Sequence, residues 1–333
     1  MNRRDLDAFV AHHQLAPAVI DAVLDLAAAR PTSNEVRQFA VRLLQLAGVL
    51  SLAAGVVFFV AANWKEFRVA GRFALVESLL IITVSLALWR PAPHSLGRNA
   101  ILMAFIATGA LLALFGQTYQ TGADVYELYL TWAWLGLPFV VAGQWSVICA
   151  AWLVVLNTAL LLFFGWRPQG GLLWPVFAHW SANTSVLLAP VVVNLVLWAF
   201  TEGLKRTRWS SMVPPWIPRL ILVFAFGFMT WAGTKAIAHS SIDGDDALAL
   251  FIVLVLQAAL VAYALRVRDD VFPLALTAGS LIVLSTCALG THGRFDDVGM
   301  FVVLALWLVV SSTASGRVLM SFVRAWRHEE NAA

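Results

Sequence analysis

The feature that most constrains this chain is a succession of apolar segments, most of them close to 20 residues long. A helix of about 20 residues, rising about 1.5 Å per residue, crosses a hydrocarbon core about 30 Å thick. Ten such segments follow one another with short polar breaks between them, at 41–62, 70–89, 99–116, 127–143, 145–165, 184–202, 218–237, 246–265, 271–290 and 297–315. The sequence therefore predicts an all-α, polytopic integral membrane protein with about ten transmembrane helices.

The charge content supports a lipid environment. Only 12% of the residues are charged and 61% are hydrophobic, whereas soluble domains carry roughly 25% charged residues. A soluble protein of this length would have too few charges to cover its surface, so the lipid bilayer is the expected partner. The basic residues lie in short loops and form no stripe on one face, which argues against nucleic-acid binding.

The distribution of basic residues predicts the orientation. Of the 22 Lys and Arg residues, 16 fall on the side of the N-terminus and six on the other: Lys65, Arg68, Arg72, Arg167, Lys235 and Arg294. Basic loops favour the cytoplasm, so we expect both termini there. The weakest boundary is Gly143-Gln144, because merging the fourth and fifth segments would invert every later segment and destroy this bias.

The flanks of the apolar region are predicted to be helical. Residues 1–36 are expected to form a cytoplasmic pair of amphipathic helices and a linker, followed by a transmembrane domain at 37–316. Thr32 and Glu35 have capping-box spacing, which predicts the start of the next helix. Residues 317–333 are expected to form an interfacial helix on the cytoplasmic leaflet, whose apolar face consists of Leu319, Phe322, Val323 and Trp326.

Two polar clusters lie at the predicted outer ends of the segments. Asn63 and Trp64 follow the first segment, where they also suit a helix cap and an interfacial anchor. A second cluster runs from the third segment into the fourth and contains Gln117, Tyr119, Gln120, Asp124, Glu127 and Trp132. It is either an outward-facing binding site or re-entrant turn, or an ordinary solvated loop with an aromatic belt.

A few polar residues lie within the apolar segments. Glu77 is a carboxylate in the second segment, and such a residue usually faces the bundle interior, as part of a pathway or as a hydrogen-bonding structural residue. Amide side chains in the segments are predicted to form hydrogen bonds between helices; they are Gln45, Asn157, Asn194 and Gln257.

Catalytic motifs are absent from the sequence. It contains no GxxxxGK[ST], HExxH or GxSxG pattern, so no catalytic residue and no cofactor are assigned, and an intramembrane enzyme is the weakest reading. His239 with Asp243 and Asp245 follows no defined metal-site spacing, so no metal is assigned either.

The first half resembles a family of bacterial inner-membrane proteins, the domain of unknown function 2157. The resemblance is carried by Ala61-Ala62-Asn63-Trp64 and by the run from Phe115 to Asp124, and it covers roughly residues 5–145. It implies a bacterial inner-membrane location and a complex with a companion small membrane protein, but it implies no reaction.

Two functions remain open at this point. The first is a transport-like protein in which the polar clusters form an outward-facing site and Glu77 lies deeper in the pathway. The second is a non-transporting sensor, scaffold or assembly module, which acts through the N-terminal helical pair and a partner protein.

Overall fold

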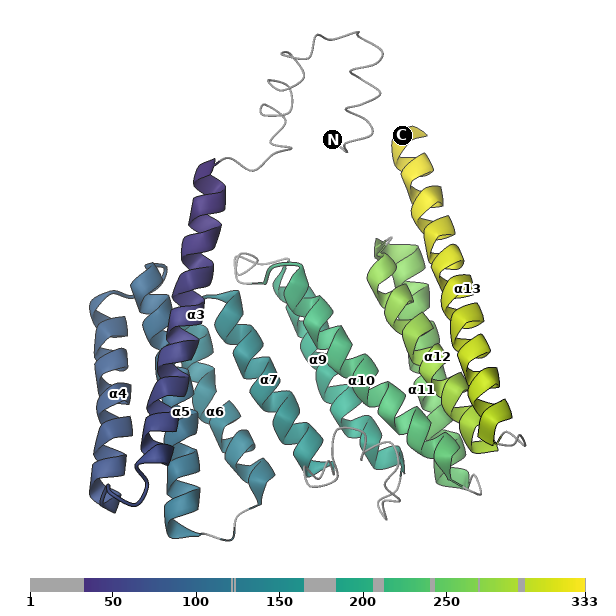
Figure 1. The fold of residues 1–333 in the computed structure, drawn as a ribbon. Coiled ribbons are helices and arrows are strands. Elements are labelled where there is room, and N and C mark those ends of the chain that lie inside the picture. The colour runs from purple at the N-terminus through teal and green to yellow at the C-terminus, as the bar shows by residue number, and fades with distance from the viewer. Residues whose placement is uncertain are drawn as a thin grey trace. The chain divides into compact units, whose positions relative to one another are not determined.

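The structure, a computed structural model, describes residues 33–120, 122, 124–164, 184–205, 213–239, 243–268, 270–292 and 297–332. Within these ranges the chain is helical and contains no strand. The helices are α3 (Ser33–Ala62), α4 (Val69–Trp89), α5 (Ser95–Tyr119), α6 (Val125–Gly143), α7 (Ser146–Phe163), η2 (Thr184–Leu187), α9 (Leu188–Leu204), α10 (Trp216–Ala238), α11 (Gly244–Tyr263), the π-helical η4 (Ala264–Arg268), α12 (Val271–His292) and α13 (Asp297–Ala332) (Figure 1). The predicted helical pair within residues 1–36 lies outside the described residues.

The described residues form ten helices long and apolar enough to cross a membrane, when η2 is counted with α9 and η4 with α11. This confirms the predicted all-α polytopic architecture. The boundary at Gly143 is also confirmed, because Gln144 adopts a left-handed conformation (φ 44°) that ends α6. The Trp152 indole Nε1 of α7 donates to the carbonyl oxygen of Ala133 in α6 at 2.8 Å, so these two helices pack as a hairpin.

The last helix is longer than the sequence suggested. Helix α13 runs from the last predicted segment, 297–315, on into the predicted tail helix, and its 36 residues span about 54 Å. Gly316 costs only about 1 kcal/mol in a helix interior, and no proline follows it. The interfacial position of residues 317–333 stays a prediction.

The chain divides into two compact units, Met1–Leu111 and Leu112–Ala333, with the boundary inside α5. In the first unit, α3 exposes most of its residues and α4 about half of its residues. The first part of α5 is the most deeply buried segment of this unit, since every residue from Ala100 to Phe105 is at most 5% exposed.

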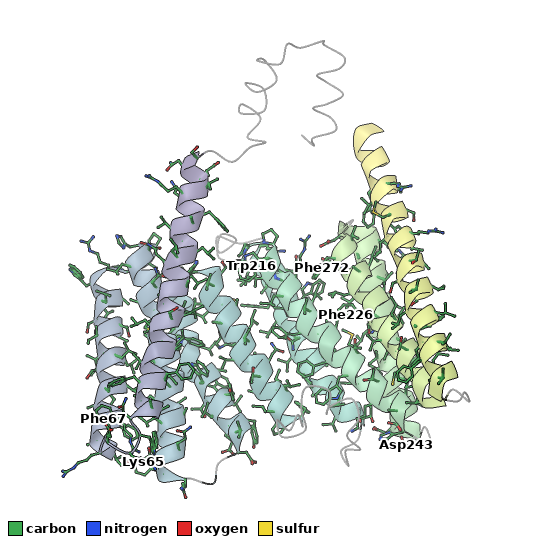
Figure 2. All side chains as sticks on the ribbon, viewed as in Figure 1. Lys65, Phe67, Trp216, Phe226, Asp243 and Phe272 are labelled. Carbon is green, nitrogen blue, oxygen red and sulfur yellow. The ribbon has the colours of Figure 1, made fainter. Side chains whose placement is uncertain are left out.

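In the second unit, α10 is the central helix and packs against α9, α11 and α12. Its Phe226 and Met229 belong to a buried apolar core that includes Val253 of α11 (Figure 2). A Cβ atom added at Gly233 of α10 would lie 2.6 Å from a methyl carbon of Leu284 in α12. The glycine therefore permits the close approach of α10 and α12.

Amides within the second unit join helices, as predicted. Asn194 Nδ2 of α9 donates to Asn157 Oδ1 of α7 at 2.8 Å. Gln257 Nε2 of α11 donates to Ser280 Oγ of α12 at the same distance. Gln45 is exposed on α3, so its interhelical bond stays a prediction.

Candidate functional site

Asn63 and Trp64, the first predicted cluster, close the turn after α3. The backbone N–H and the side-chain Nδ2 of Asn63 both donate to the carbonyl oxygen of Phe59, at 3.1 and 2.8 Å. The Arg72 guanidinium lies 3.8 Å from the centre of the Trp64 ring and donates to the Trp64 carbonyl oxygen. Asn63 thus caps the helix, as predicted, and a role for either residue in ligand binding stays a prediction.

The second predicted cluster begins inside α5, because the helix continues past residue 116 to Tyr119. Gln120 and Gly122 then adopt left-handed conformations, with φ of 43° and 69°, and this geometry ends the helix. Asp124 is extended, and its carbonyl oxygen accepts from the N–H of Glu127 at 3.0 Å as α6 begins. The family-like stretch therefore links the end of α5 to the start of α6, and this link is called the reversal below.

Most of the predicted site residues of this reversal are exposed, whereas the Thr118 hydroxyl is buried. Trp132 is half-buried, and Tyr119 is 58% exposed and stacks on Phe115 with ring centroids 4.8 Å apart. The other predicted members are also exposed: Gln117, Gln120, Asp124 and Glu127. Their exposure fits either a solvated surface or one wall of an outward-facing site.

Glu77 lies on the exposed face of α4, with Ala74 and Ser78. The buried positions of this helix are Val76 and Thr83, which lie on a different face. Within its unit the carboxylate therefore does not face the interior, and its role in a pathway or as a hydrogen-bonding structural residue stays a prediction. Inserting a carboxylate at the centre of a membrane helix costs about 2.5–3.5 kcal/mol of free energy on insertion scales. A polar or charged neighbour at this face of α4 would reduce that cost.

A buried ionisable cluster lies where η2 and the facing ends of α10 and α11 meet. The Asp246 side chain is 2% exposed. Its Oδ1 accepts from the Thr184 hydroxyl at 2.6 Å, and its Oδ2 lies 2.7 Å from Nδ1 of His239. The backbone N–H of Asp246 donates to Asp243 Oδ1 at 2.8 Å, so Asp243 caps α11. One carboxylate therefore joins three separate segments of the chain.

Lys235 adds a positive charge to this cluster. It is 8% exposed, lies one turn before His239 on α10, and is attracted by the charges of Asp246 and Asp245. Asp245 Oδ2 also accepts from the backbone N–H of Ser185 at 3.1 Å. We define the charge cluster as Lys235, His239, Asp245 and Asp246. An imidazole and a carboxylate are groups that can exchange protons, and the half-buried His239, 30% exposed, leaves the cluster accessible.

Polar groups continue from the charge cluster along α10. The Thr230 hydroxyl lies 2.7 Å from Ser280 Oγ, which accepts from Gln257 Nε2. Between these groups and Lys235, the Cys287 thiol donates to the Thr234 carbonyl oxygen at 3.7 Å. Figure 2 shows Asp243 at one end of this unit, with Trp216 and Phe272 at the other. The polar groups thus extend from that first end toward the middle of the helices.

Sequence reasoning assigned no role to Lys235 or Asp246. It counted Lys235, which lies within the predicted segment 218–237, only for the orientation, and took Asp246 as the first residue of the next segment. The detectable signal was a Lys and a His one helical turn apart, followed within seven residues by three carboxylates. The weak metal idea for His239, Asp243 and Asp245 gains no support, because the described residues contain no group of three ligands able to hold a metal ion.

Comparisons with known proteins bear on the first half of the chain. A search of curated proteins and a search of solved structures each found no match. A family model described as "Predicted membrane protein (DUF2157)" matches residues 7–149, which include Asn63 and the reversal at Gln117–Asp124 but not the charge cluster. The match confirms the resemblance drawn from the sequence. The chain is accordingly a multi-pass membrane protein whose residues 7–149 are similar to the DUF2157 family of predicted membrane proteins.

Proposed function

We propose that this chain is a transport-like protein of the bacterial inner membrane that moves a small polar or charged solute. The observation that carries the proposal is the charge cluster, in which Lys235 and Asp246 are buried at the ends of membrane-spanning helices. Charges in such positions are expensive, and they commonly mark solute pathways or proton relays. Asp246 and His239 are the proposed entry point for a proton or small cation.

The proposed topology places this entry on the outer face. If each helix crosses once, the ends of α3, α5 and α10 lie on the same side of the membrane. The bias of basic residues assigns that side to the periplasm and both termini to the cytoplasm. Asn63, the Gln117–Glu127 reversal and the charge cluster would then all face outward, with Glu77 deeper in the membrane.

The test is a current measurement on the full-length protein in liposomes adsorbed to a solid-supported membrane. The liposomes are exposed to a panel of amino acids, sugars, organic anions and inorganic cations under a pH gradient. At least one solute should evoke a current, and Asp246→Asn should abolish it. Asparagine keeps the size of the side chain and an acceptor for Thr184, but it cannot carry charge or a transferable proton.

The matched control is Asp270→Asn. This carboxylate lies beside the start of α12, at the other end of the unit, and pairs with Arg219 at 3.3 Å between partly exposed side chains. Its current should match wild type at equal protein density. If the wild-type protein gives no current with any solute of the panel, or if Asp246→Asn and the wild type give equal currents, the transport proposal is refuted.

The predicted reversal site is tested separately with Gln117→Ala and Asp124→Asn. Wild-type currents in both variants would exclude only that site.

One observation favours a second candidate, a sensor or scaffold that acts through a companion membrane protein. Glu77 is exposed near the middle of α4, and a partner helix with a hydrogen-bond donor or a basic side chain would relieve its cost.

The second candidate gives its own prediction. Deleting residues 1–31 should abolish the cellular phenotype while the remaining chain still inserts, because the predicted cytoplasmic helices would carry the signal. Membrane abundance and complementation of a deletion strain measure the two effects. Full complementation by the shortened chain would exclude this function.

A further inference from the structure

An apolar groove of about 430 Å³ runs along α11 and η4 beside α12. Ala258 and Ala262, one helical turn apart on α11, are both exposed and leave the surface hollow between larger side chains. Leu254 and Arg266 mark its two ends on one side, and Leu281 of α12 borders the other. The groove lies within the second unit and does not include the charge cluster.

The length and position of the groove match one leaflet of a bilayer. Leu254 and Arg266 are twelve residues apart, which is about 18 Å along a helix. One leaflet contributes about 15 Å of hydrocarbon. Leu254 is ten residues, or about 15 Å, from Gly244 at the start of α11, so it lies near the bilayer centre. Arg266 then lies at the depth of the lipid headgroups.

The lining presents an apolar surface because its uncharged polar side chains, Thr277 and Gln257, are buried. The Thr277 hydroxyl donates to the Pro273 carbonyl oxygen of its own helix at 2.9 Å. Gln257 is 2% exposed and its amide nitrogen is held by Ser280. The exposed Arg266 is the one charged side chain among the residues that line the groove. The groove therefore offers a hydrocarbon surface that ends in a single positive charge.

We propose that this groove binds one anionic phospholipid, with an acyl chain along Ala258 and Ala262 and the phosphate on Arg266. A guanidinium forms charge-assisted, often bidentate, hydrogen bonds with a phosphate. A lipid with net negative charge is favoured over a zwitterionic one, because the described residues that line the groove include no carboxylate to hold a cationic headgroup. This site stands independently of the proposed transport function.

The experiment offers equal amounts of phosphatidylglycerol and phosphatidylcholine to the full-length protein in detergent micelles and counts retained lipids by native mass spectrometry. The wild-type protein should retain one phosphatidylglycerol in preference. Ala258→Trp should lose it, because the indole fills the hollow. Ala259→Trp is the matched control, since Ala259 is the exposed neighbour on α11 that does not line the groove.

The headgroup contact has its own variant. Arg266→Gln should weaken phosphatidylglycerol retention about fivefold, equivalent to about 1 kcal/mol. Arg37→Gln on α3, which removes an exposed arginine elsewhere, should leave retention unchanged. Wild-type retention in both Ala258→Trp and Arg266→Gln would overturn the proposal. So would a change in oligomeric state on Ala258→Trp with lipid retention intact, because the groove would then hold a second copy of the chain.

Discussion

Replacing Asp246 with leucine is expected to lower the free energy of unfolding by about 3–5 kcal/mol. Lys235 would remain buried without one of the two carboxylates whose charges attract it. The Thr184 hydroxyl and the His239 ring would also lose their acceptor, and an unsatisfied buried donor is itself costly. Loss of monodisperse protein on heating in detergent, and denaturant titration, would both measure the change.

Two comparison variants separate the charge effect from a simple packing defect. Asp245→Leu removes the neighbouring carboxylate, which is more exposed and accepts from Ser185, so its cost should be only about 1 kcal/mol. The double variant Asp246→Leu with Lys235→Met removes both charges and should recover most of the loss, since a buried pair replaced by apolar residues is often tolerated. A double variant no more stable than Asp246→Leu would contradict the charge explanation.

The membrane helices were predictable because the length of an apolar segment can be read directly from the local sequence. Ten apolar segments of membrane-spanning length became ten helices that could cross a bilayer. Their ends were less predictable, since a helix ends where the backbone turns and not where polarity begins. Gln117 is polar yet remains helical in α5, and the left-handed Gln120 and Gly122 end that segment. At the other end of the chain, α13 runs without a break from the last predicted segment, 297–315, into the predicted tail helix.

The sequence predicted which residues form hydrogen bonds between helices, but not which residues they bond to. A buried amide in lipid needs a hydrogen bond, which correctly anticipated bonds for Asn157, Asn194 and Gln257. The bond from Thr184 to Asp246 joins residues 62 positions apart, and no local pattern specifies such a pairing. Lys235 lay inside the predicted segment 218–237 but was counted only for the orientation, so the charge cluster emerged only from the structure, in which η2 and the ends of α10 and α11 meet.

Gly233→Leu is expected to destabilise the protein by about 3 kcal/mol, at the upper end of typical overpacking costs. Even the first added carbon would meet a Leu284 methyl at 2.6 Å, and Leu284 is 4% exposed, so it has little room to move. The branched end of the new side chain would enlarge the clash and force α10 and α12 apart. Thermal and denaturant unfolding in detergent would measure the effect.

Gly227→Leu is the matched control on the same helix, because a Cβ atom there meets nothing within 4 Å and the position is exposed. Leucine should stabilise α10 at that site by up to about 1 kcal/mol through its higher helix propensity, so the two substitutions should differ in sign. Shortening the opposing side chain by Leu284→Ala should then rescue Gly233→Leu in a double-mutant cycle. Equal stability changes at positions 233 and 227, or no rescue by Leu284→Ala, would mean that close packing of α10 on α12 does not stabilise this unit.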